Sequence, residues 1–231
     1  MRLTHATACV CLLSTAGLAA AQVQPYAPEW ASYRDAYRAM VVFEKYGGAK
    51  NLLQNHLQLV PRAKGVLADG IQLALTGKTV RTSLTLDALG RTVLPLVKAA
   101  YDENAVLAPN RRLGGFTLRA RVSIATQPDN TYETADLRSA CEQALAYARH
   151  VDASARSQRC EGVRMVFAKH SGDISVRLRG ADGEQPLQLV AGPAFAGDAV
   201  ADLPGATYRF SGESAQLVTY GAPLAIVPLF E

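Results

Sequence analysis

The feature that most constrains the fold is the strict alternation of apolar and polar residues in Phe116–Ile124. One face of this segment is apolar throughout, and the other carries only threonine, arginine and serine. A period of two is typical of a half-buried antiparallel strand with one face in a core. Weaker forms of the pattern begin near Leu57, Ile71 and Ser83, and Asp87–Gly90 has the residues of a hairpin turn. We therefore predict an antiparallel β module in the first half of the chain.

Two segments carry a helical period instead. The first runs from about Glu29 to Tyr46 with aromatic residues along one side, and the pair Gly47–Gly48 is expected to end it. The second runs from about Thr134 to Asp152, with Thr134 as the candidate N-cap. After this second helix the alternation of apolar and polar residues returns in several short segments, which is typical of a β-meander.

These elements predict an α+β chain with two halves. Residues 22–128 are expected to form an N-terminal helix and an antiparallel β-sandwich-like module. Residues 129–231 are expected to form a helix packed on an antiparallel β-meander. The turn-forming run Pro128–Asp129–Asn130 separates the two halves. The sequence leaves open whether the halves are independent domains.

The first 21 residues have the pattern of a secretory signal peptide rather than of a folded element. Arg2 leads into a short apolar run, and the small residues Ala19–Ala21 precede the polar Gln22. The run is shorter than the roughly 20 residues that span a bilayer. We therefore expect cleavage near Ala21, a periplasmic or secreted location, and no transmembrane segment in the mature chain.

The predicted export places the cysteines in an oxidising compartment, where disulfides form. Cys141 and Cys160 remain after cleavage, and an even pair in an oxidising compartment predicts one disulfide. Cys141 lies on the apolar stripe of the second predicted helix, where it can meet a strand that begins at Cys160. The bridge would close the loop between these two cysteines, and a loop of about 20 residues predicts that the disulfide stabilises the folded state by roughly 3 kcal/mol. The alternative is a pair of free, buried thiols.

Charge and motifs exclude several functional classes. The chain has 24 basic and 20 acidic residues, a mixed and mildly basic balance that does not predict a nucleic-acid-binding protein. The sequence has no metal-ligand spacing, no phosphate-binding loop and no G-x-S-x-G motif, so we predict no metal and no cofactor. Of the histidines that remain after signal cleavage, His56 is expected at the solvated end of a strand and His150 in the last turn of a helix.

Four arginines are the candidate ligand-binding residues. Arg119 and Arg121 project from one predicted strand, and Arg177 and Arg179 project from another. If those strands are neighbours, the outer faces form a small cationic patch for an anionic glycan, a lipid headgroup or an acidic partner. The alternative is an ordinary solvated face with acidic residues across the strands.

We expect a soluble, exported protein that binds or supports a component of the cell envelope, with no residue assigned to catalysis. The predicted partner is an envelope protein or an anionic envelope component. One alternative is a periplasmic hydrolase that uses His170 or His150 with a serine or carboxylate from elsewhere in the fold. Another is a subunit of an envelope assembly that buries an exposed strand edge against its partner.

Overall fold

The computed structural model describes most of the chain beyond residue 28. The predicted signal peptide, residues 1–21, lies outside the described residues, and so do His170 and Ser171. Within the described part, no helix combines the length and the apolar character needed to cross a membrane. The described residues are 29–62, 67, 70–169, 172–181, 183–198, 200, 202–212 and 214–231.

Helices make up the smaller part of the described residues. Both of the helices predicted from the sequence are present, and a short helix and a 3₁₀ turn lie beside them. The helical elements are α1 (Tyr33–Lys45), α2 (Lys98–Asp102), α3 (Thr134–Val151) and the 3₁₀ turn η1 (Ala153–Ser157).

The two ends that the sequence assigned to helix caps are built differently. Helix α1 ends at Tyr46 without a left-handed glycine, because the Lys50 ammonium group donates to the backbone carbonyls of Phe43 and Tyr46 at 2.7 and 3.1 Å. The helix therefore ends directly before Gly47–Gly48, as predicted, but neither glycine adopts the left-handed conformation of a glycine cap. Thr134 is also not an N-cap, since its hydroxyl oxygen accepts a bond from the Ala215 amide at 3.1 Å.

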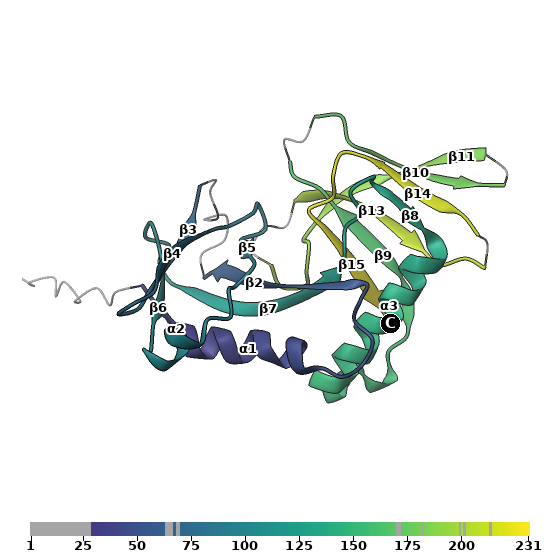
Figure 1. Ribbon diagram of the computed structural model, residues 1–231. Coiled ribbons are helices and arrows are strands. Elements are labelled where there is room, and N and C mark those ends of the chain that lie inside the picture. The colour runs from purple at the N-terminus through teal and green to yellow at the C-terminus, as the bar shows by residue number, and fades with distance from the viewer. Residues whose placement is uncertain are drawn as a thin grey trace, which may run out of the picture.

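Antiparallel strands dominate the fold, as the alternating sequence predicted, and the chain is an α+β protein (Figure 1). The largest sheet has seven strands, and it joins both halves of the chain through the register pair Ile124 and Ile226. The division at residue 128 stays a prediction. In spatial order the sheet contains β12 (Leu189–Gly192), β13 (Leu203–Arg209), β9 (Cys160–Val166), β15 (Ala225–Phe230), β7 (Phe116–Ile124), β2 (Leu53–Pro61) and β5 (Arg91–Thr92).

Two four-stranded sheets flank the large one (Figure 1). The first belongs to the N-terminal half and contains β1 (Ala31–Ser32), β6 (Val106–Pro109), β3 (Gln72–Thr76) and β4 (Arg81–Thr85). The second belongs to the C-terminal half and contains β11 (Gly183–Leu187), β10 (Ser175–Gly180), β14 (Gln216–Tyr220) and β8 (Thr131–Glu133).

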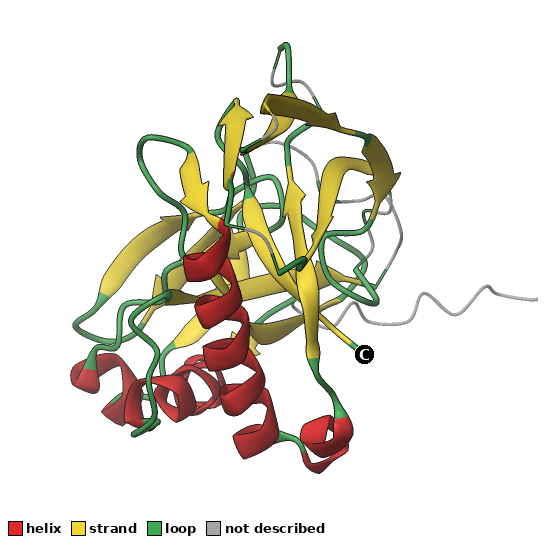
Figure 2. Cartoon of the chain, turned by 90° about the vertical axis from the view of Figure 1, so that its right-hand side faces the viewer, coloured by secondary structure: helices red, strands yellow, loops and turns green. Residues whose placement is uncertain are grey.

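Helices α1 and α3 cover one face of the seven-stranded sheet (Figure 2). Helix α1 buries Tyr33 and Met40 against Leu57 and Leu59 of β2. Helix α3 packs its apolar stripe on β9, β7 and β15. The alternation of the strands therefore leaves their remaining side chains on the opposite face.

That opposite face is polar where β2, β7 and β5 lie side by side. The register places His56 across from Arg121 and Gln58 across from both Arg119 and Arg91. Cross-strand partners share a face, so these side chains form one surface, which we call the polar face. Its members are Gln54, His56, Gln58, Arg91, Arg119, Arg121 and Ser123.

Candidate functional site

A closed ring of three polar side chains lies at the centre of the polar face. The Arg121 guanidinium donates to a carboxylate oxygen of Asp198 at 3.0 Å and to the side-chain oxygen of Gln58 at 2.6 Å. The Gln58 amide nitrogen completes the ring by donating to the other Asp198 oxygen at 3.1 Å. The Asp198 side chain is 6% exposed and the Arg121 side chain is 20% exposed, so this ion pair is largely shielded from solvent. We call these residues the clamp.

The coil between β12 and β13 brings Asp198 to the clamp. The Asp198 carboxylate also accepts a bond from the Phe195 amide at 3.3 Å, across a turn in which Gly197 has a φ of 78°. Phe195 of the same coil is buried in one cluster with Leu89, and the Arg121 guanidinium lies 5.0 Å from the centroid of the Phe195 ring. A cation over an aromatic face is favourable, so the coil supports Arg121 from two directions.

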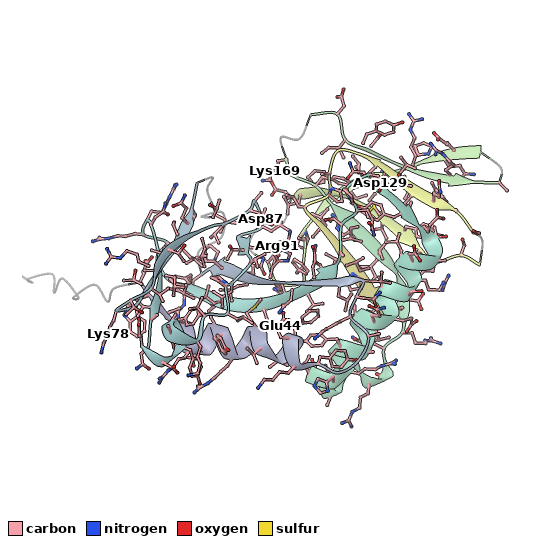
Figure 3. The ribbon with its side chains drawn as sticks, in the orientation of Figure 1. Glu44, Lys78, Asp87, Arg91, Asp129 and Lys169 are labelled. Carbon is pink, nitrogen blue, oxygen red and sulfur yellow. A yellow bond between two sulfur atoms is a disulfide. The ribbon has the colours of Figure 1, made fainter. Side chains whose placement is uncertain are left out.

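Arg91 is the second buried cation of the polar face. Its side chain is 4% exposed and donates twice to one oxygen of Asp87, at 2.9 and 2.8 Å. It also donates to the Leu224 carbonyl. The remaining terminal nitrogen, Nη1, is buried and has no partner within the described part of the chain. Figure 3 shows Asp87 and Arg91 together near the middle of the molecule.

His56 lies inside strand β2, and the expectation that it occupies a solvated strand end is wrong. Its side chain is half-buried, and its Nδ1 has no partner among the described residues. Burial lowers the pKa of the imidazole, the nearby positive charge of Arg91 lowers it further, and Asp87 opposes these effects. The polar face therefore favours a neutral His56.

This environment predicts a pH dependence of stability. Below the ordinary imidazole pKa of 6.5, the unfolded chain takes up a proton that the folded His56, with its lowered pKa, still excludes. The free energy of unfolding should therefore fall as the pH drops below about 6.5. The substitution His56→Gln should remove this acid-dependent loss of stability. Urea unfolding between about pH 7.5 and about pH 5.5 measures the loss in each variant.

His150 provides the matched control. It is exposed at the end of α3, where its ring lies 5.1 Å from that of Tyr46. The His150→Gln variant should keep the acid-dependent loss that His56→Gln removes. If the free energy of unfolding falls with pH equally steeply in the wild type and in His56→Gln, the acid-dependent loss does not come from His56. His150 is one of the two histidines considered for a hydrolase, and the other, His170, lies outside the described residues.

The polar face carries an excess of positive charge. Three guanidinium groups, those of Arg91, Arg119 and Arg121, share it with the carboxylates of Asp87 and Asp198. Burial lowers the pKa of Arg121, Asp198 opposes this effect, and the positive charge of Arg119 adds to it. An arginine stays charged under such a shift, so among the described residues the face keeps one cation without a matching carboxylate when His56 is neutral.

The other two candidate arginines lie elsewhere. Arg177 and Arg179 project from β10 in a different sheet, and both pair with Glu184 of β11, at 3.2 and 2.6 Å. The two strands are not neighbours, so the single patch of four arginines that the sequence suggested does not form. The pair on β10 instead matches the solvated face with cross-strand acids.

The two cysteines are together where helix and sheet meet. The Sγ atoms of Cys141 in α3 and Cys160 at the start of β9 are 2.21 Å apart, a disulfide-bonding distance. Among the described residues, no group of three or more histidine, cysteine, aspartate or glutamate side chains is placed to hold a metal ion.

Sequence reasoning missed several residues of this site. The polar residues at every second position of β2, including His56 and Gln58, were a usable signal, because they mark one face of a strand. Asp198 gave no signal, since it lies in a coil 140 residues from Gln58. No family model, curated protein or solved structure matches this chain. The geometry of the polar face is therefore the basis for a functional proposal.

Proposed function

We propose that this chain is an exported protein of the cell envelope that binds an acidic partner through its polar face. The observation that carries the proposal is the unmatched positive charge at the polar face, together with the buried nitrogen of Arg91 that has no partner in the described residues. Guanidinium groups hold carboxylates through paired, charge-assisted hydrogen bonds. No residue is assigned to catalysis, and the partner supplies the missing negative charge.

Arg119 is the first contact in this proposal. It is exposed on β7 beside the clamp, and no acidic partner holds it within the described residues. An exposed cation next to a shielded ion pair attracts an anion and directs it toward the clamp. The sandwich-like arrangement of the N-terminal half belongs to the same proposal, with β1, β6, β3 and β4 as its second layer. The shared apolar cluster between this small sheet and β2 supports that arrangement.

A short acidic peptide tests the proposal directly. We expect a fluorescein-labelled hexaglutamate peptide to bind the protein at low ionic strength, with fluorescence anisotropy as the readout. The substitution Arg119→Gln should weaken this binding by roughly fivefold, the effect of one exposed charge pair. Added salt should weaken binding further, since the contacts are exposed ion pairs.

The matched control is Arg177→Gln, which removes the same charge from a different sheet. Its binding of hexaglutamate should equal that of the wild type. Equal losses in Arg119→Gln and Arg177→Gln would show that net charge alone attracts the peptide. Either that result or no binding by the wild type would contradict the proposed function.

A further inference from the structure

The contacts of Asp198 are those of a bound carboxylate. Its two oxygens accept from the Arg121 guanidinium at 3.0 Å, the Gln58 amide at 3.1 Å and the Phe195 backbone at 3.3 Å. A carboxylate is an acceptor-only group, and a site that recognises one presents convergent donors of this kind. The donors on Arg121 and Gln58 come from the sheet, whereas Asp198 comes from a coil.

The donors hold each other in place without Asp198. The Arg121 Nε donates to Gln58 at 2.6 Å, and the Gln58 amide also donates to the Leu89 carbonyl at 3.0 Å. Gln58 is 3% exposed, so its amide cannot turn toward bulk solvent if the carboxylate departs. A buried donor left without an acceptor is costly, which favours replacement of Asp198 by a second carboxylate.

We propose that Arg121 and Gln58 form a carboxylate-binding subsite and that Asp198 is the chain's own occupant of it. This inference rests on the proposed function and specifies the ligand chemistry. A carboxylate of the partner competes with Asp198 for the same donors. Only the molecules in which Asp198 has left the subsite can bind the partner's carboxylate. The apparent affinity for the partner is therefore reduced in proportion to that fraction. Arg119, exposed beside the subsite, is where the incoming carboxylate arrives.

The experiment removes the occupant's charge and measures carboxylate binding. In Asp198→Asn the side chain keeps its shape but no longer competes as an anion. The matched control is Asp202→Asn, because Asp202 belongs to the same coil but pairs with Lys169 at 2.6 Å and takes no part in the bonds of the clamp. Both variants lose one negative charge. A difference between their affinities for a carboxylate therefore reports the release of the subsite and not the change in net charge.

Two probes separate the sources of a carboxylate, a free organic acid and an acidic peptide. Acetate represents the first, and the tripeptide acetyl-Gly-Asp-Gly-amide represents the second, with the Asn tripeptide as its blank. Binding is followed by NMR titration at constant ionic strength against chloride. We expect Asp198→Asn to bind at least one probe about tenfold or more tightly than the wild type does. Asp202→Asn should match the wild type, and the Asn tripeptide should not bind.

A second measurement on the wild type covers the case in which Asp198→Asn fails to fold. Saturating acetate should accelerate hydrogen exchange at the Phe195 amide, which loses its acceptor when Asp198 leaves, whereas chloride should not. Equal carboxylate affinities in Asp198→Asn and Asp202→Asn would overturn the inference, and so would unchanged exchange in acetate.

The two proposals fail in different ways. If hexaglutamate binding depends on Arg119 but Asp198→Asn gains nothing, the internal occupant is refuted and the proposed function stands. If Asp198→Asn gains carboxylate binding but Arg119→Gln leaves hexaglutamate binding unchanged, the subsite stands and the proposed entry of an acidic partner through Arg119 is refuted.

Discussion

The Gly162→Ala variant should lose about 3 kcal/mol of folding stability or more, because its added methyl group collides with the backbone of the neighbouring strand. A Cβ at this position would lie 2.1 Å from the Tyr208 carbonyl oxygen and 3.0 Å from the Arg209 Cα. Those atoms belong to β13, which pairs with β9 through residue 162, so they cannot yield without breaking the sheet. The unfolding midpoint in urea measures the loss.

Two other glycines calibrate this result. At Gly212 a Cβ would meet no atom within 4 Å, so Gly212→Ala should change stability by less than about 0.5 kcal/mol. At Gly205 a Cβ would lie 2.7 Å from the end of the Arg164 side chain, which can move, so the loss should be intermediate. A midpoint for Gly162→Ala equal to that of Gly212→Ala would contradict the packing of β9 against β13.

Removing the disulfide is the second large perturbation. The double variant Cys141→Ala with Cys160→Ala should lose roughly 3 kcal/mol, because the unfolded chain regains the freedom of the loop that the bridge closes. The sequence separation of the two cysteines is 19 residues. Alanine is chosen since Cys141 is fully buried in the α3 interface, where a serine hydroxyl would add its own cost. Calorimetry or urea unfolding measures the change.

Reduction supplies the control for this variant. A reducing agent should destabilise the wild type by a comparable amount and leave the double alanine variant unchanged. If reduction leaves the melting temperature of the wild type unchanged, the two thiols are not joined in the protein.

Local patterns predicted much of the secondary structure. The alternation in Phe116–Ile124 corresponds to β7 along its whole length, and the predicted helix from Thr134 to Asp152 corresponds to α3 within one residue. These segments succeed because their period follows directly from which face is buried. The pairing of β7 with β15 could not be predicted from a local pattern in the sequence, because pairing between distant strands depends on the whole fold.

The candidate site was harder to predict than the fold. Arg121 was named from the polar side of its strand, and its strand neighbours on β2 were accessible to the same logic. Its ion-pair partner, Asp198, comes from a coil in which Phe195 is buried, and no local pattern of the sequence marks that contact. Arg177 and Arg179 were grouped with Arg121 because identical residue types on two strands do not reveal which sheet each strand joins.

The position of β15 has a consequence for the order of folding. This strand follows every other strand of the large sheet in sequence, yet it lies between β9 and β7. Until residues 225–230 are available, the sheet consists of two separate three-stranded pieces with open edges. Assembly must therefore wait for a late, long-range contact, which makes slow maturation and transiently unpaired strands an intrinsic property of this topology.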